Sequence, residues 1–597
     1  MSCTCTCSLA PTDPVLPPPM DEMQAADLPR GLQMGILSSC SKSFALGVLF
    51  HWSIVGVEID GQGWRLVGVY LAAVMLLWAL FASLGHMHAF EAAFRTACVA
   101  NSFKLGLAAS IFAYRLLFHR LRKFPGPKYA AASRFYAMYL ACKNTQFSNE
   151  VEKMHKQYGD FVRIGPREIS INRPAAVRLI YGPPSVCKKS PWYSQVTEDV
   201  TKCSINSTRV LEVQRQRRRA WDRGFSIKAL SSYEPRVRAK TEVLIRQLRA
   251  RAESKTPVDA TAWSMFFSFD VMGAVGLGRD FQTLEAGREH ATIRGIHDSM
   301  AAIGLLTPVP WLLRMAAGVP GAASKLTAFM AYCSAQVRDK EREVHRDADP
   351  QDIISWLIKA RFEHDRSAPP GEMALHEDAR LLIIAGSDTT AAALANTLNL
   401  LARHPRVLAK LQAQLSAAFP HGASDDAFTA ATLAKAVPYL DAVINESLRL
   451  HPPVPGGLAR VTPAEGLVVD GVHVPGDTIV SVPTQTLQRD ERNFERAAEF
   501  RPERWSGESE GGEEGGQRGL NPENAAFIAF SRGAMNCAGK QLAKMEMRLF
   551  LARVAMEFDV VYAEGETGEG FEKGQLDTFT LTLPPLMLRF VPRGTGA

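Results

Sequence analysis

The strongest apolar segments of the 597-residue chain lie within its first 124 residues. Residues 66–84 hold no charged side chain, and a helix of that length crosses a bilayer core of about 30 Å. Residues 43–57 form a shorter candidate, and residues 97–118 form one that is long enough but contains two basic residues. The pattern predicts a tail and membrane anchor over residues 1–124, with two or three transmembrane helices.

A basic segment follows the third apolar stretch. Its sequence is His119-Arg-Leu-Arg-Lys-Phe-Pro125-Gly-Pro127. Because positive residues stay on the cytosolic side of a membrane, we expect the chain after this point to face the cytosol. A cleaved signal peptide fits poorly, since the strongest apolar run begins too far from the N-terminus. A soluble helical domain in front of the body is the alternative.

The body of the chain, residues 125–597, is mostly helical in its periodicity. Strand patterns occur at residues 160–171 and 466–482, and the second alternates around an Asp470-Gly471 turn. These patterns predict a mainly α domain with a small β-sheet region. An acidic, glycine-rich insertion at residues 506–520 is expected to be mobile.

Composition limits the classes of partner. At 47% hydrophobic and 22% charged residues the chain can bury a large core, and its net charge of +7 favours acidic neighbours such as anionic lipid or an acidic electron donor. Nucleic acid is disfavoured, because the basic residues are scattered rather than arrayed with aromatic ones. In a cytosol-facing protein the ten cysteines do not indicate a disulfide framework. Cys3, Cys5 and Cys7 indicate a disordered tail rather than a metal site, with lipidation as the alternative.

One cysteine lies in a pattern that suits a thiolate. Phe530-Ser-Arg-Gly533-Ala-Met-Asn-Cys537-Ala-Gly539 is followed at once by the helical run 540–550. Glycines let backbone N–H groups approach the sulfur, and a helix N-terminus lowers a thiol pKa. Phe530 would cover the sulfur. By itself, a cysteine in such a turn is better explained as an ordinary buried residue, and only the segments upstream of Cys537 favour the thiolate.

Two further segments carry charges within apolar surroundings. In residues 441–453, Glu446 and Arg449 share one face of a helix that a proline pair ends, and a buried ion pair of this kind needs another partner. The segment 500–505 offers Arg504.

The other segment, residues 381–394, is an apolar helix with Asp388, Thr389 and Thr390 at its middle. Such groups are costly in an apolar helix unless they are satisfied. Either a helix kink, with Thr389 bonded to the preceding turn, or a functional role explains them, and both can hold together.

These segments, in this order, resemble the cytochrome P450 family over roughly residues 124–597. The cysteine segment matches F-x-x-G-x-[RH]-x-C-x-G except at Met535, where the family has a basic residue. The resemblance implies the P450 fold, with Cys537 as the haem-iron ligand in a loop shaped by Phe530, Gly533 and Gly539.

The resemblance also assigns roles to the other segments. Glu446, Arg449 and Arg504 form a structural triad that braces the cysteine loop. Asp388 and Thr389 manage the protons of oxygen activation, while Ala385 and Gly386 leave room for oxygen.

Haem propionates need cations, and the resemblance points to Arg460 and Arg218. Arg218 lies in an arginine run whose helix carries Gln214 where the family has tryptophan. The alternative for this run is a solvated basic face that receives a partner protein. Met535 removes one expected cation from the cysteine loop.

The function implied is a membrane-bound, endoplasmic-reticulum haem-thiolate monooxygenase. It would use O2 and electrons from NADPH, delivered by a separate cytochrome P450 reductase, with cytochrome b5 as a second candidate donor, to oxidise a lipophilic small molecule in fungal secondary metabolism. The alternatives are a reductase-independent haem-thiolate isomerase or dehydratase, which tends to lose the distal acid and threonine, and a non-catalytic haem-binding protein.

The substrate pocket is expected from four segments: residues 191–210, residues 295–326, the distal helix and residues 454–458. Their side chains are mainly apolar, which favours a lipophilic substrate. The side chains concerned are Trp192, Tyr193, Ile303, Leu305, Leu306, Pro308 and Trp311.

Overall fold

The computed structural model describes residues 30–195, 197–290, 294, 300, 302–344, 349–421, 427–506 and 524–594. The chain divides into two compact units. The helical unit contains residues 1–57 and 67–113, and the catalytic unit contains residues 58–66 and 114–597. The predicted insertion at 506–520 lies outside the described residues except for its first position, and so do Cys3, Cys5 and Cys7.

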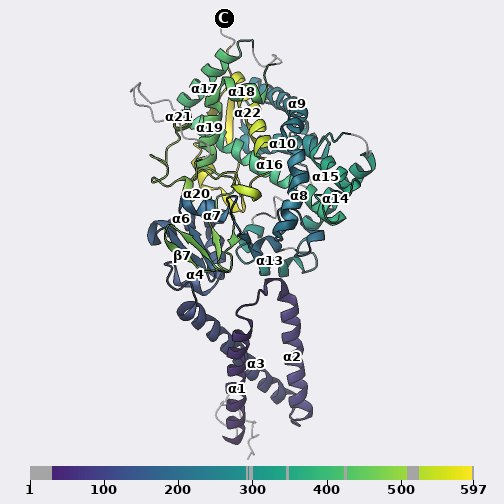
Figure 1. The fold of residues 1–597 in the computed structure, drawn as a ribbon, viewed down its shortest axis with the longest axis vertical. Coiled ribbons are helices and arrows are strands. Elements are labelled where there is room, and N and C mark those ends of the chain that lie inside the picture. The colour runs from purple at the N-terminus through teal and green to yellow at the C-terminus, as the bar shows by residue number, and fades with distance from the viewer. Residues whose placement is uncertain are drawn as a thin grey trace, which may run out of the picture. The chain divides into compact units, whose positions relative to one another are not determined.

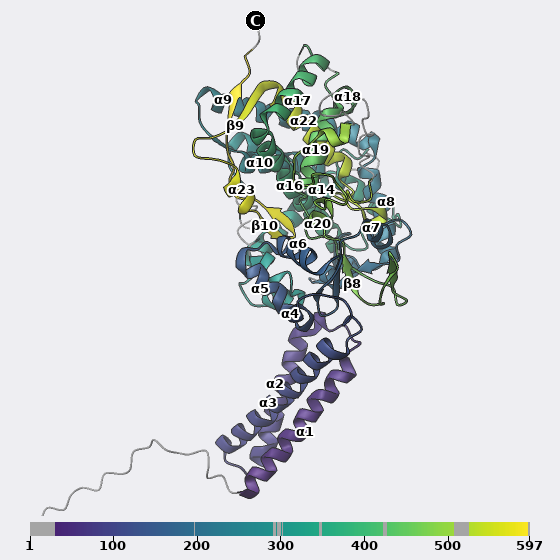
Figure 2. The same ribbon diagram turned by 90° about the vertical axis from the view of Figure 1, so that its left-hand side faces the viewer.

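The helical unit is built from α1 (Arg30–Ile54), α2 (Gly63–Ser83) and α3 (Ala89–Ala113) (Figure 2). Glycine allows α1 and α3 to pack closely: a Cβ at Gly47 would lie 2.3 Å from the Phe103 carbonyl oxygen. The Ser43 hydroxyl also donates to the carbonyl of Val99 at 2.8 Å. Small residues and interhelical hydrogen bonds of this kind are typical of helix pairs in membranes.

Two helices of this region are long and apolar enough to cross a membrane, namely Gly63–Ser83 and Ala89–Phe118. Two further helices meet the same criterion but are largely buried in the catalytic unit, so they belong to its core. Most of the expected segment 43–57 lies in α1, which begins earlier, contains Lys42 and ends at Ile54; α1 is not among the helices apolar enough in the described part of the chain. The expected segment 97–118 lies within a longer helix, which begins at Ala89 and ends at Phe118.

The catalytic unit is mainly helical, and α16 runs through its interior (Figure 1). Its helices are α4 (Lys128–Ala132), α5 (Phe135–Asn144), α6 (Phe147–Tyr158), α7 (Pro174–Ile180), α8 (Leu211–Gly224), α9 (Ile227–Glu253), α10 (Ala260–Met272), α11 (Thr283–Ala286), α13 (Pro310–Ala317), α14 (Ser324–Glu343), α15 (Ile353–Phe362), α16 (Glu372–Arg403), α17 (Pro405–Ala418), α18 (Ala430–Ala436), α19 (Pro438–Leu450), α20 (Thr484–Gln488), α21 (Glu503–Ser506), α22 (Lys540–Glu557) and α23 (Glu569–Lys573).

Small sheets complete the catalytic unit. One has the strand order β1-β2-β8-β5-β3, a second has the order β4-β12-β9, and β6-β7 and β10-β11 are hairpins. The strands are β1 (Phe161–Gly165), β2 (Glu168–Ile171), β3 (Lys188–Lys189), β4 (Val258–Asp259), β5 (Arg460–Val461), β6 (Leu467–Val469), β7 (Val472–Val474), β8 (Ile479–Ser481), β9 (Phe558–Tyr562), β10 (Leu576–Thr578), β11 (Thr580–Thr582) and β12 (Met587–Pro592). The mainly helical fold with small sheets is as predicted.

Local sequence explains the elements that lead to the site. Asp470 and Gly471 both have positive φ, as a two-residue hairpin turn between β6 and β7 requires. Helix α19 begins with proline at its first position and ends at Leu450, two residues before the proline pair. In α22 the buried face includes Met545, Met547 and Phe550, which anchor this helix in the core behind the cysteine loop.

Candidate functional site

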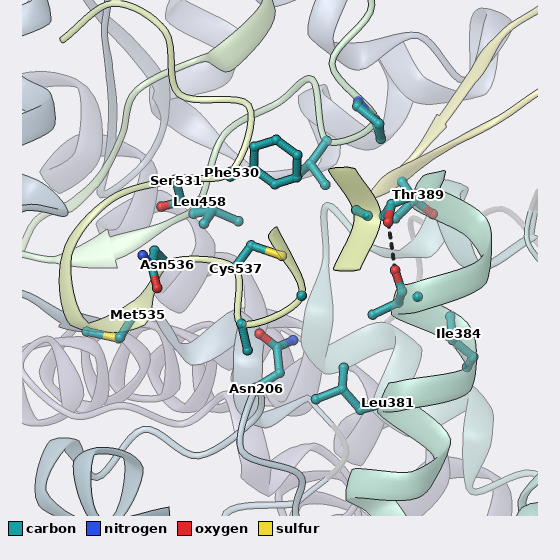
Figure 3. Close-up of a pocket in the computed structure, with 18 of the residues that line it drawn as sticks. Asn206, Leu381, Ile384, Thr389, Leu458, Phe530, Ser531, Met535, Asn536 and Cys537 are labelled. Atoms are coloured by element: carbon teal, nitrogen blue, oxygen red, sulfur yellow. Dashed lines mark hydrogen bonds between the residues drawn. The ribbon is translucent and has the colours of Figure 1, made fainter. Parts of the chain in front are cut away.

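Cys537 lies in a tight loop between a 3₁₀ turn at Gly533–Met535 and the start of α22 (Figure 3). Its backbone N–H donates to the carbonyl of Phe530 at 3.0 Å, which closes the loop. Gly533 has φ +70°, and a Cβ there would lie 2.1 Å from the carbonyl oxygen of Tyr181. Only glycine fits that close approach, so the glycine spacing of the motif is required by the packing of the loop.

The thiol environment corrects one expectation. Burial raises the pKa of the Cys537 thiol, and the backbone N–H of Gly539, the charge of Arg218 and the Lys540 side chain and N–H lower it. The groups that favour a thiolate are therefore present, yet the net direction is upward because the sulfur is enclosed by protein. The sulfur remains accessible from within an internal cavity.

The cavity has a volume of about 500 Å³ and is mostly apolar, and Cys537 and Thr389 both line it. The Thr389 hydroxyl donates to the carbonyl of Ala385 at 2.7 Å, so the expected bond to the preceding turn is present, within a helix that is continuous from Glu372 to Arg403 (Figure 3). Asp388 is half-buried in the same helix and is not among the lining residues.

Ala385 and Gly386 both line the cavity. Gly386 also has a packing role: a Cβ there would lie 2.5 Å from the Met272 sulfur, so the missing side chain allows α10 to pack against α16.

Five of the segments that line this cavity lie outside the cysteine loop. They are the segment with Trp192 and Tyr193, the loop 204–207, α16, the loop 453–458 and the tip of the β10–β11 hairpin. The hairpin tip was not expected: it brings Phe579, which stacks on Trp192 with 4.6 Å between ring centroids. From the described part of the span 295–326, the cavity is lined by Met300 alone. Ile303, Leu305, Leu306, Pro308 and Trp311, which we expected there, do not line it.

Two buried cations line the cavity. Arg460 is 2% exposed, donates to the Tyr193 hydroxyl at 3.1 Å, and leaves its Nε without a hydrogen-bond partner among the described residues. Lys189 is 5% exposed, and its Nζ donates to the carbonyls of Ile205 and Asn206 at 3.0 and 2.8 Å. Burial and the nearby charge of Arg460 lower the pKa of Lys189 to about 7.

A buried cation without a carboxylate partner is costly, so a cavity with Arg460 and Lys189 in its wall is suited to an anionic ligand. Together with the accessible sulfur, this donor set fits a haem. Lys189 was missed in the sequence because a two-residue strand with two lysines carries no pattern that reports the burial of one of them.

Arg218 contacts the cysteine loop. From α8 it donates to the backbone carbonyl of Asn536 at 2.8 Å and to its side-chain oxygen at 2.9 Å, and it pairs with Asp222 at 2.7 Å. It also lines the cavity, as does Gln214 one turn earlier, whose buried Oε1 has no partner among the described residues.

The remaining arginines of the run differ in exposure. Arg217 is buried and pairs with Asp378 of α16 at 2.7 Å, while Arg215 and Arg219 are exposed. The run is thus only partly a solvated face.

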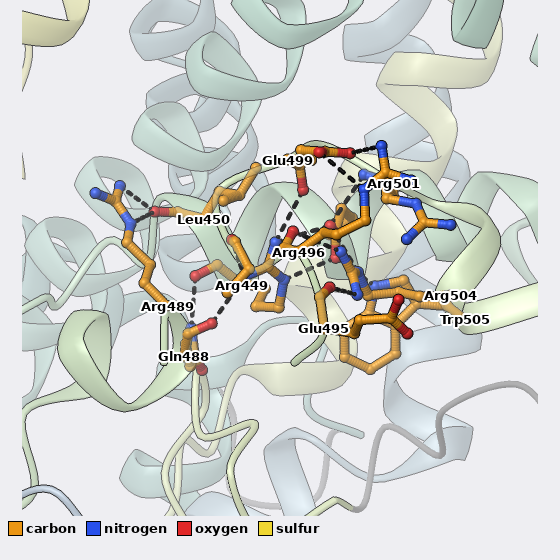
Figure 4. A network of polar contacts seen from close by, with 12 residues as sticks. Arg449, Leu450, Gln488, Arg489, Glu495, Arg496, Glu499, Arg501, Arg504 and Trp505 are labelled. Carbon is orange, nitrogen blue, oxygen red and sulfur yellow. Dashed lines mark hydrogen bonds and ion pairs between the residues drawn. The ribbon is translucent and has the colours of Figure 1, made fainter. Parts of the chain in front are cut away.

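Glu446, Arg449 and Arg504 lie together in the core (Figure 4). Arg449 Nε and Nη2 each donate to one carboxylate oxygen of Glu446 at 2.9 Å, and Arg504 Nε also donates to Glu446 at 2.9 Å. Glu446 and Arg449 are fully buried. Trp505 Nε1 adds a further donor to Glu446 at 2.8 Å, which the sequence did not predict. Arg449 also donates to the carbonyls of Gln488, Ala497 and Glu499, so the cluster ties α19 to the segment that leads toward the cysteine loop.

Comparison with known proteins agrees with this geometry. The family model for cytochrome P450 matches residues 125–590. The chain belongs to the cytochrome P450 family. The cytochrome P450 monooxygenase FCK2 of Fusarium pseudograminearum is 38% identical over 500 residues, which cover 84% of this chain and 87% of the relative. The tryprostatin B 6-hydroxylase of Aspergillus fumigatus is 36% identical over 467 residues, which cover 78% of this chain and 80% of the relative.

This P450 is therefore a monooxygenase-type oxidoreductase, as predicted. The cytochrome P450 monooxygenase orf5 of Eupenicillium brefeldianum, 38% identical over 489 residues, covers 82% of this chain and 95% of its own length. Met535 differs from the basic residue of the family pattern, and its side chain lines the cavity (Figure 3).

Proposed function

We propose that this P450 binds haem through Cys537 and uses O2 and electrons from NADPH, delivered by a separate reductase, to oxidise a lipophilic small molecule. The observation that carries the proposal is the shared cavity: the accessible sulfur of Cys537 and the hydroxyl of Thr389 both line it, along with apolar side chains. Haem held by Cys537 would supply the oxygen chemistry, and thiolate ligation would favour O–O cleavage.

Each residue of the chain has a defined task in this proposal. Gly539 and Lys540 donate N–H groups to the sulfur and Arg218 adds positive charge, so they offset the cost of the buried thiolate. Arg460 and Lys189 would hold the propionates, and each would gain an anionic partner, which neither has among the residues that the structure describes.

Thr389 and Asp388, both on α16, transfer the protons that the reaction needs. The Thr389 hydroxyl can turn from the Ala385 carbonyl toward the cavity, where it accepts and passes on a proton. Asp388, half-buried one residue earlier, connects this hydroxyl with solvent. The apolar walls around them exclude bulk water, which protects the reaction from wasteful side reactions.

The substrate class follows from the wall of the cavity. Trp192, Phe579, Leu381, Ile384 and Leu458 present apolar surface, which favours a lipophilic substrate. A relative acts as a tryprostatin B 6-hydroxylase, so we place this chain in fungal secondary metabolism and take tryprostatin B as the first compound to test.

Partners and location complete the proposal. The apolar helices Gly63–Ser83 and Ala89–Phe118 support membrane association, and the basic residues after Phe118 support an endoplasmic-reticulum protein whose catalytic unit faces the cytosol. Exposed Arg215 and Arg219, on the helix that also contacts the cysteine loop, suit an acidic electron donor such as the reductase or cytochrome b5.

The test is reductase-dependent oxidation with isotopically labelled O2. Full-length protein in detergent, with reductase, NADPH and tryprostatin B or a panel of indole and terpenoid compounds, should consume NADPH and give a product that gains one labelled oxygen. A rearranged product formed without NADPH would favour an isomerase instead, and bound haem with no turnover of any compound would favour a non-catalytic protein.

A further inference from the structure

The loop Glu58–Leu66 joins α1 to α2 in sequence, yet it belongs to the catalytic unit. It contains a 3₁₀ turn at Asp60–Gln62 and the first turn of α2. Neither the motifs of the family pattern nor the cavity lining includes it.

Glu58 forms a two-point ion pair with Arg209. Its Oε1 accepts from Arg209 Nη1 at 2.6 Å and its Oε2 accepts from Nη2 at 3.1 Å. The side chains are 34% and 26% exposed, so solvent screens the pair only in part. Side-on geometry fixes the guanidinium plane as well as its position.

The same guanidinium holds the wall of the cavity. Arg209 Nε donates to the carbonyl of Lys189 at 3.2 Å, and Nη1 donates to the hydroxyl of Ser194 at 3.2 Å. Between these two acceptors lie Trp192 and Tyr193, which line the cavity. Glu58 therefore orients the arginine that fixes both ends of this lining segment.

A second contact ties the loop to α13. Trp64 Nε1 donates to the carbonyl of Met315 at 3.2 Å, and the Met315 sulfur packs so close to Gly63 that a Cβ there would lie 2.6 Å from it. At Gly61, a Cβ would lie 2.7 Å from Arg314 and 3.2 Å from Glu198. Gly61 and Gly63 thus allow the loop to pack closely against Arg314 and Met315 of α13.

We infer that the loop 58–66 is a structural part of the substrate-cavity wall, and that Glu58 is a positioning residue that acts through Arg209 on the segment 189–194. The inference rests on the proposed haem cavity. It means that the connection between α1 and α2 sets how tightly the cavity holds a ligand, without touching the ligand itself.

The test measures ligand dissociation rather than turnover. Full-length wild type and the variants Glu58→Gln, Arg209→Gln and the double variant are loaded with clotrimazole, a lipophilic azole whose nitrogen binds haem iron. Its dissociation is followed by stopped-flow displacement, and the carbon monoxide difference spectrum gives the haem content of each. Glu343→Gln is the control, because Glu343 pairs with Arg279 at 2.7 Å, the side chains are 51% and 30% exposed, and neither residue lines the cavity.

We expect dissociation about two- to fivefold faster in Glu58→Gln and Arg209→Gln, the range for a partly exposed ion pair. The double variant should be no faster than Arg209→Gln alone, since Glu58 acts on the lining segment only through Arg209. Haem content and the Glu343→Gln rate should match wild type. A Glu58→Gln rate equal to that of Glu343→Gln would overturn the inference, whereas wild type without an azole spectrum would overturn the proposed haem site itself.

Discussion

Replacing Glu446 by alanine tests the buried cluster that supports the cysteine loop. Glu446 accepts hydrogen bonds from Arg449, Arg504, Trp505 and the backbone N–H of Arg501, and it is the carboxylate that neutralises fully buried Arg449. The substitution leaves that guanidinium with only backbone carbonyls. Removing one partner of a buried pair costs about 3–5 kcal/mol.

The consequence should be loss of holoprotein. A domain is stable by about 5–15 kcal/mol, so Glu446→Ala removes a large share of that stability and loosens the segment before the cysteine loop. We expect little or no carbon monoxide-binding haem in purified membranes at normal expression temperature, and partial recovery on expression in the cold.

The matched control lies on the same helix. Asp441 pairs with Arg548 through two contacts at 3.0 and 2.8 Å, but this pair is partly exposed. Asp441→Asn should therefore cost no more than about 1 kcal/mol and keep wild-type haem content. If Glu446→Ala retains haem as well as Asp441→Asn does, the reasoning about the cluster is refuted.

Three further predictions concern pH, the hairpin and the cysteine loop. Burial, and after it the charges of Arg163 and other arginines, lower the pKa of His119 to about 4. The unfolded chain therefore binds more protons than the folded chain between pH 4 and 6.5, so the stability of the fold should fall as the pH drops through that range. His119→Gln should reduce this fall when the unfolding temperature is measured against pH. Phe579 has φ +86° and stacks on Trp192, so it should favour aromatic ligands. Phe579→Leu should weaken the binding of aromatic ligands by about 0.5–1.5 kcal/mol in spectral titrations and leave the binding of aliphatic ligands unchanged. Equal losses of affinity for both kinds of ligand would contradict the stacking role. Met535→Arg places a cation in the cavity wall and should raise the haem reduction potential in a redox titration, whereas an unchanged potential would show that position 535 lies outside the reach of the haem charge.

Features that depend on local sequence were predictable. The proline pair that ends α19, the Asp470-Gly471 turn and the glycine spacing around Cys537 each set a local backbone conformation, and the structure has the expected elements there. The spacing of Glu446 and Arg449 on one helix face likewise follows from helix geometry alone.

Features that depend on tertiary packing were missed. Lys189 becomes a cavity cation only because β3 is buried beside β5, and Phe579 reaches the cavity only through the fold of a hairpin about forty residues past the cysteine. The net rise in the thiol pKa and the packing of Met272 on Gly386 have the same origin, because burial is a property of the assembled core.

The carbon monoxide difference spectrum of Cys537→Ser tests the account most directly. Wild type should give the long-wavelength band of a thiolate-ligated ferrous haem, and the serine variant should lose that band even where it still retains haem. A serine variant with the same band as wild type would contradict the assignment of the iron ligand to Cys537.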